Sequence, residues 1–141
     1  MLSVFNKVRY LTHPGVRERL TAHTKHRAES TGSRCYNCHM PYTSYGLLRA
    51  LRSHRISSPS VAASVETGRP NACNQCHLDK TLAWTADRLA EWYNISVPPL
   101  EDDDRTLPAS MIWLLRGDAG QRALMAWTLA APPPTAGAAS T

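Results

Sequence analysis

Two five-residue segments share one pattern: Cys35-Tyr36-Asn37-Cys38-His39 and Cys73-Asn74-Gln75-Cys76-His77. Together they use all 4 cysteines of the 141-residue chain. C-x-x-C-H is the attachment signature of c-type haem. Two thiols separated by two residues can reach the two vinyl groups on one porphyrin edge as thioethers, and the next histidine is carried under the ring. The pattern predicts two covalently bound haem c groups, with His39 and His77 as the proximal iron ligands.

A zinc site is the first alternative, because C-x-x-C pairs also occur in Cys₄ and Cys/His zinc sites. Residues 39–72 separate the two pairs here, which is 34 residues. Zinc sites built from two such pairs usually have about 15–20 residues between them. Zinc also gives no reason for a histidine directly after both pairs. Two disulfides are the other alternative, but a C-x-x-C bridge closes too short a loop to stabilise a fold.

Two haems need two further axial ligands, and four of the 6 histidines lie outside the motifs. His54 lies between the motifs, where a loop could bring it to either iron. His26 and His23 precede the first motif on adjacent turns of a predicted helix, and either could serve as a distal ligand. The last of the four, His13, precedes a proline near the N-terminus and is the least favoured candidate for a distal ligand.

Methionine is the alternative axial ligand, and it raises the reduction potential of a haem. Met40 follows His39 directly, so it cannot reach the opposite face of the same haem. Met111 and Met125 have the positions of core residues in the C-terminal helices. We therefore expect two six-coordinate, low-spin haems with bis-histidine ligation.

Large aliphatic side chains are scarce in this chain. Leu, Ile, Val and Phe account for 25 of 141 residues, about 18%, a value at which chains often fail to bury a core. The expected haems would supply the missing apolar surface. The length allows one domain with tails. We divide the chain into an N-terminal, partly helical segment (1–22), a di-haem module (23–96), an acidic linker (97–106), a helical hairpin (107–131) and a disordered tail (132–141).

The predicted fold is mainly α-helical with long irregular loops: a small di-haem cytochrome c domain followed by a short helical hairpin. Apolar spacing and caps place helices at about 14–26, 43–53, 82–93, 108–116 and 118–130. The third of these has Thr81 as its N-cap. Residues 57–70 are predicted as a loop because they are rich in Ser and Pro. No period-2 strand pattern persists.

Charge divides the chain into a basic and an acidic part. Residues 1–60 carry ten Lys/Arg against two Glu, and residues 61–141 carry six against nine Asp/Glu. A basic half can meet nucleic acid, anionic lipid or an anionic ligand, or form a solvated face. The arginines are scattered, which argues against nucleic-acid binding, and haem propionates or an acidic redox partner could be their counterparts. No stretch is long and apolar enough for a transmembrane helix. The first twenty residues show no secretory signal pattern either.

The segment from His23 to Asn94 resembles a module of bacterial multihaem c-type cytochromes with doubled C-x-x-C-H motifs, loosely related to the cytochrome c nitrite reductase and tetrahaem group. The resemblance rests on three blocks: His26, Gly32 and Cys35–Pro41; Ser53-His54-Arg55-Ile56; and Pro70–Lys80, which is PNACNQCHLDK. It implies that His54 and one of His23 or His26 are distal ligands. Longer members carry more motifs upstream and helical repeats downstream, so we expect a truncated, fragmentary or minimal member.

The expected function is electron transfer by two bis-histidine haems that relay electrons between redox partner proteins. Other multihaem cytochromes and membrane complexes are candidate partners. The chain is therefore expected to be an electron carrier rather than an enzyme. A five-coordinate haem that reduces a nitrogen or sulfur oxyanion or a peroxide is the catalytic alternative, and a zinc-binding interaction module is the non-haem one. Haem is attached outside the cytoplasm, so a periplasmic or otherwise extracytoplasmic location is expected.

Overall fold

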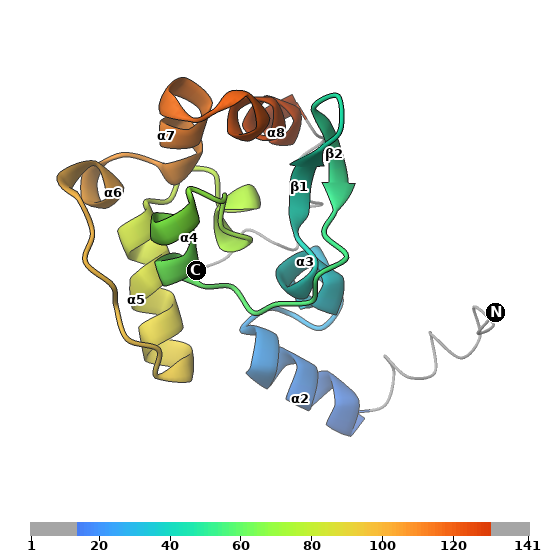
Figure 1. Cartoon of the computed structure of the whole chain (residues 1–141). Helices are drawn as coiled ribbons and strands as arrows, with labels where there is room; N and C mark the ends of the chain where they lie inside the picture. Colours follow the sequence, from blue (N-terminus) through green and yellow to red (C-terminus); the bar gives the residue numbers. More distant parts are fainter. Residues whose placement is uncertain (1–13, 131–141) are drawn as a thin grey trace. The chain divides into compact units, whose positions relative to one another are not determined.

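The computed structural model describes residues 14–130, which belong to two units. The described part of the first unit is 14–37, and the second unit is described over 38–130. The structure is mainly helical, as predicted (Figure 1). Within residues 14–130, no helix is long and apolar enough to cross a membrane. His13 and the predicted tail, 132–141, lie outside the described residues.

The first unit contains helix α2 (Pro14–Thr24), the 3₁₀ turn η1 (Thr31–Ser33) and the start of α3 (Cys35–His39). Pro14 begins α2, as its fixed φ and missing N–H favour at a first helical position. The helix was predicted to extend to His26 but ends at Thr24, because Lys25 adopts a left-handed φ of 57°. No residue of α2 is buried.

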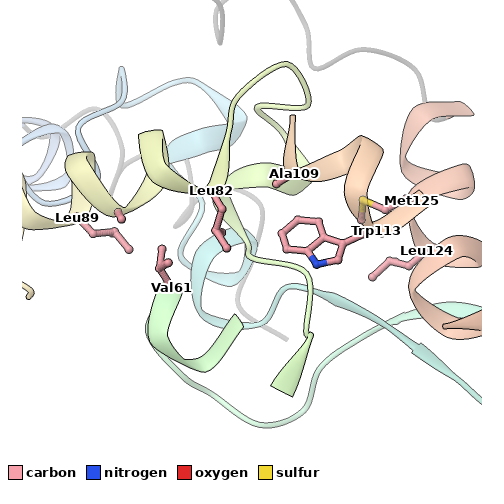
Figure 2. Close-up of a cluster of buried hydrophobic side chains, with 8 residues drawn as sticks. Val61, Leu82, Leu89, Ala109, Trp113, Leu124 and Met125 are labelled. Carbon is pink, nitrogen blue, oxygen red and sulfur yellow. The ribbon is translucent and has the colours of Figure 1, made fainter. Parts of the chain in front are cut away.

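The second unit holds the apolar core, which comes from four helices: α4 (Val61–Thr67), α5 (Leu82–Tyr93), α7 (Ala109–Arg116) and α8 (Ala119–Ala130). Between α5 and α7 the predicted acidic linker contains a short helix, α6 (Asp102–Thr106). The core side chains are Val61, Leu82, Ala86, Leu89, Ala109, Trp113, Leu124 and Met125 (Figure 2). Residues 38–60 contribute none of these buried core side chains.

Helices α5, α7 and α8 match their predictions. Thr81 caps α5 by accepting a hydrogen bond from the Trp84 backbone N–H at 3.0 Å. The predicted helical hairpin forms, since α7 and α8 pack against each other. Trp113, Leu124 and Met125 are buried in the core, whereas Leu115, Trp127 and Leu129 are exposed.

Two local predictions were wrong. Residues 43–53, predicted as a helix, contain the antiparallel strands β1 (Tyr42–Tyr45) and β2 (Arg49–Arg52). The leucine spacing was compatible with a helix, but Gly46, Leu47 and Leu48 all have positive φ and turn the chain. Strand β1 lies beside α8 (Figure 1), and the Tyr42 and Trp127 ring centroids are 4.6 Å apart. A contact so distant in sequence is not visible in a local pattern.

The second wrong prediction concerns residues 57–70, which were predicted as a loop but contain helix α4. The Ser60 side chain accepts from the Ala63 N–H at 3.2 Å, and Gly68 ends the helix with a left-handed φ of 69°. Both residues are standard caps. The α8 residue Gln121 donates its Nε2–H to the Gly68 carbonyl, which ties the end of α4 to α8.

Met125 and Met111 provide a matched test of the core, because both were predicted to be buried. Met125 has an exposed fraction of 0% and Met111 of 41%. Met125→Ala should lower the free energy of unfolding by about 2–5 kcal/mol, since it leaves a cavity between α7 and α8. Met111→Ala should change it by less than about 1 kcal/mol. Urea denaturation of the haem-loaded protein measures both; equal losses would contradict this core.

Candidate haem-binding site

The second motif is a tight turn that begins with the 3₁₀ helix η2 (Cys73–Gln75). The Cys73 carbonyl accepts hydrogen bonds from the backbone N–H groups of Cys76, at 3.1 Å, and His77, at 2.9 Å. Asn71 begins the turn, because its buried side-chain oxygen accepts from the Cys73 N–H at 3.0 Å. A single hydrogen-bonded turn therefore carries both thiols and the histidine of this motif.

Asn74, the first spacer residue of this motif, has an exposed fraction of 0%. Its Nδ2 donates to the carbonyl oxygens of Lys80, at 3.1 Å, and Thr81, at 3.4 Å. Its Oδ1 accepts from the Thr85 hydroxyl at 2.8 Å. Every one of these partners lies at or next to the start of α5, so Asn74 fastens the motif to the most regular helix of the unit.

Gln75, the second spacer residue, joins this motif to the segment that follows the first one. The Tyr42 N–H donates to Gln75 Oε1 at 3.1 Å, and Gln75 Nε2 donates to the Tyr42 carbonyl at 2.9 Å. Tyr42 begins β1 and is three residues beyond His39. The two bonds satisfy both backbone groups of Tyr42, and they place the ends of the two motifs next to each other.

The first motif forms helix α3, whose last residue is His39. His39 Nδ1 lies 3.1 Å from the Ser57 carbonyl oxygen, and the Ser57 N–H donates to the His39 carbonyl at 3.0 Å. A carbonyl oxygen only accepts, so the hydrogen is on Nδ1 and the lone pair is on Nε2. Histidines that ligate metals are commonly oriented by such a bond. His39 is thus held in the tautomer that an iron ligand requires.

The four thiols differ in exposure. Cys35 and Cys76 are exposed, whereas Cys38 and Cys73 are half-buried. Removal from water, followed by the charges of Cys38 and Cys76, raises the pKa of Cys73 to about 12, so this thiol is neutral at physiological pH. Burial first, and then Cys38 and Cys73, also raise the pKa of Tyr93. These effects place Cys38, Cys73 and the C-terminal end of α5 in one neighbourhood.

His77 is half-buried beside α5. Its ring centroid lies 5.0 Å from that of Trp84, with the planes tilted by 47°. Trp84 is on the first turn of α5, whose start is fastened to Asn74. The helix that anchors the motif therefore also limits the rotation of its histidine.

The expected distal histidines lie in different parts of the chain. His54 is exposed in the bend after β2, and the backbone on both sides of it is bonded to the end of the first motif. The Ser53 N–H donates to the Pro41 carbonyl at 2.9 Å, and Ser57 pairs with His39. The bend that carries His54 is therefore fixed to the first motif at both of its ends.

His23 and His26 belong to the first unit and differ in their surroundings. His23 is exposed on α2, whereas His26 is half-buried and its Nδ1 lies 2.5 Å from the Thr24 carbonyl oxygen. Gly32 lies directly against the His26 ring, since a Cβ added there would be 2.3 Å from Cδ2. Only glycine leaves room for the imidazole in this position.

These residues fit a haem c group. Each motif offers a pair of thiols and a histidine, and His39 has its lone pair on Nε2. Within residues 14–130, His, Cys, Asp and Glu side chains form no group of three or more that could hold a metal ion. The ligand cluster that a zinc module requires is thus not formed in this part of the chain.

Sequence reasoning identified the cysteines and histidines but missed the residues that hold them. Asn71, Asn74, Gln75 and Ser57 were not singled out, although they make the bonds described above. A signal was present in the motif itself: a carboxamide side chain at each spacer position of Cys73–His77. Two adjacent carboxamides in a short turn are well suited to bonding backbone groups of neighbouring segments.

Gln75→Ala tests the connection between the motifs. It removes two hydrogen bonds, each worth about 1 kcal/mol, and exposes the backbone groups of Tyr42. The free energy of unfolding should fall by about 1–3 kcal/mol, and the Tyr42 amide should lose protection from hydrogen exchange. Asn37→Ala is the matched control, because Asn37 is the second spacer of the first motif and bonds the Thr31 carbonyl instead. Unchanged exchange at Tyr42 in Gln75→Ala would refute the connection.

Comparison with known proteins places the chain in a family. A family model described as cytochrome c552 matches residues 6–94, which is more than half of the chain and includes both motifs. No curated protein and no solved structure matches it. The chain belongs to the cytochrome c552 family, whose members use haem c for electron transfer or a related redox role.

Proposed function

We propose that this protein is an electron carrier that holds two haem c groups, each between two histidines, and passes electrons between redox partner proteins. The observation that carries the proposal is the pairing of Gln75 with Tyr42, because it joins the second motif to the segment that directly follows Cys38 and His39 of the first. Two redox groups attached to adjacent motifs would be close enough to exchange electrons. The family membership supports the redox role.

The proposed roles of the residues follow from their chemistry. The thiols of Cys35, Cys38, Cys73 and Cys76 form the thioethers, and His39 and His77 are the proximal ligands. When bound between two imidazoles, haem c supplies one-electron transfer and has no open coordination position for a substrate. For that reason the carrier role is favoured over catalysis.

His26 is the better candidate than His23 for one distal position. Its Nδ1 faces the Thr24 carbonyl, so Nε2 carries the lone pair, as in His39. Gly32 makes space for the ring in this orientation. His23 is exposed on a helix without buried residues. We assign the second distal position to His54, because its bend is bonded to the first motif on both sides.

Arginines near the motifs can offset the negative charge of haem propionates. Arg52 is held in place by a bond from its Nη1 to the Met40 carbonyl at 3.0 Å and by the Tyr42 ring, 4.3 Å from its Cζ. A guanidinium fixed in this way is a good partner for a carboxylate. The other basic residues of 1–60 suit an acidic redox protein. The proposed location is periplasmic or otherwise extracytoplasmic, which is typical of c-type cytochromes.

The number of haems is the direct test. The protein should be expressed in the periplasm with the haem-attachment machinery, and its intact mass and pyridine haemochrome spectrum measured. We expect a mass gain of two haems and a c-type absorbance peak. Cys76→Ser should reduce the gain or leave one haem on a single thioether. A wild-type gain of one haem would overturn the two-haem proposal, and a protein without a haemochrome peak would overturn the haem role as well.

Alanine substitutions test the distal ligands. His54→Ala and His26→Ala should each convert one of the two haems to a high-spin form, because an axial imidazole is lost. Optical and EPR spectra of the oxidised protein report this change. His23→Ala is the control and should leave both haems low-spin. A high-spin haem in the unsubstituted protein would favour the catalytic alternative. A fully low-spin spectrum in either His54→Ala or His26→Ala would remove that residue from the ligand set.

A further inference from the structure

The turn between β1 and β2 has a backbone conformation that its residues do not favour. Gly46, Leu47 and Leu48 have φ values of 35°, 46° and 59°, and the Arg49 N–H donates to the Gly46 carbonyl at 3.1 Å. Leu47 and Leu48 are therefore the central residues of a β-turn with positive φ, within the three residues that connect Tyr45 to its paired residue Arg49. Glycine and asparagine are preferred at such positions, and leucine is strained there.

Burial does not compensate for this strain. The exposed fraction is 97% for Leu47, 72% for Tyr45 and 55% for Leu48. The turn is therefore unfavourable in two ways: leucine disfavours a positive φ, and its large apolar side chain is exposed to water. Where a residue type disfavours its backbone conformation and its side chain is not buried in return, a functional reason is expected. The turn, which we call the hairpin tip (residues 45–48), is a candidate interaction surface.

The charged residues of the segment that carries the hairpin tip all have one sign. Residues 30–65 contain four arginines and neither Asp nor Glu. Arg49, which directly follows the tip, is exposed, and so is Arg55 beyond β2. The tip therefore combines exposed apolar side chains with one exposed cation, Arg49, and its segment has no negative charge of its own.

We propose that the hairpin tip inserts into the interface of an anionic lipid membrane. Leu47, Leu48 and Tyr45 would enter the boundary between headgroups and acyl chains, and Arg49 would meet the lipid phosphates. The tip is the end of a hairpin and not a groove (Figure 1). A protein partner would need a pocket shaped to receive it, whereas a bilayer interface accepts a projecting apolar loop. Binding of this kind is weak, reversible and dependent on anionic lipid.

The inference goes beyond the proposed electron-carrier role and does not depend on the number of haems. It gives the carrier a way to stay at a membrane surface. Only residues of the second unit take part. The membrane proposal can therefore be tested independently of the ligand assignments above.

The double substitution L47N/L48G separates binding from folding. Asparagine and glycine favour positive φ, so this variant should unfold at the same temperature as the wild type or higher. Its affinity for phosphatidylcholine vesicles that contain phosphatidylglycerol should fall about tenfold or more, because the apolar contact is lost. Co-sedimentation of the full-length, haem-loaded protein measures binding. Leu115→Asn is the control, since Leu115 is 67% exposed on α7, away from the tip in sequence, and should leave binding unchanged.

Arg49→Gln tests the charge. Each arginine near the surface contributes about 1 kcal/mol, so affinity for the anionic vesicles should fall about fivefold and become less salt-dependent. Equal binding to vesicles with and without phosphatidylglycerol would overturn the proposal, as would undiminished binding of L47N/L48G. Absence of wild-type binding would also overturn it. Self-association in vesicle-free buffer that L47N/L48G abolishes would assign the tip to a second copy of the chain instead.

Discussion

The two hydrogen-bonded spacer residues of the second motif, Asn74 and Gln75, are the constraint on which the site depends. A porphyrin attached at Cys73 and Cys76, as proposed, would move with the turn between them, so whatever fixes that turn would fix the cofactor. Asn74 ties it to the start of α5, and Gln75 ties it to β1. Each bond contributes only about 1 kcal/mol net, but Asn74 is fully buried, and leaving its amide unsatisfied would cost more than the bonds provide. The turn therefore has one favourable position.

The same arrangement explains how a chain with few large aliphatic residues is organised. The buried apolar side chains begin at Val61 and end at Met125, so the protein core lies beside the second motif and not around the first. Residues 38–60 are held by polar contacts, such as those of Ser57 with His39 and of Gln75 with Tyr42, and by Tyr42 and Ala50, which pack against the edge of the core. Polar contacts fix the orientation of a segment but bury little apolar surface. A segment of this kind is suited to complete its packing with a large apolar cofactor.

Local sequence patterns predicted the elements whose causes are local. Thr81 and the apolar face behind it were sufficient for α5, and the C-x-x-C-H spacing located both motifs. The hairpin was missed because its cause lies elsewhere in the chain: Tyr42 is positioned by Gln75 and Trp127, and the leucines of 47–51 fit a helix equally well. In the case of α4, both caps, Ser60 and Gly68, were visible, but the many serines and prolines around them outweighed this signal. The role of Asn74 could not be predicted, because the sequence does not show that its side chain is buried.

Charge is the remaining influence on the redox properties of the site. The Ser57 carbonyl bonded to His39 is neutral, so it increases the electron density on the imidazole less than a carboxylate would. Cys76 is exposed, yet the protein around its sulfur raises the pKa of the thiol, and the Arg52 guanidinium opposes that rise. A cation that stabilises a thiolate at this position also stabilises the electron added to an attached haem. Bis-histidine ligation gives lower potentials than histidine–methionine ligation, and Arg52 would shift the potential of the second site upward from that level. Arg52 also donates to the Met40 carbonyl next to His39, so its charge would act on a haem at either motif.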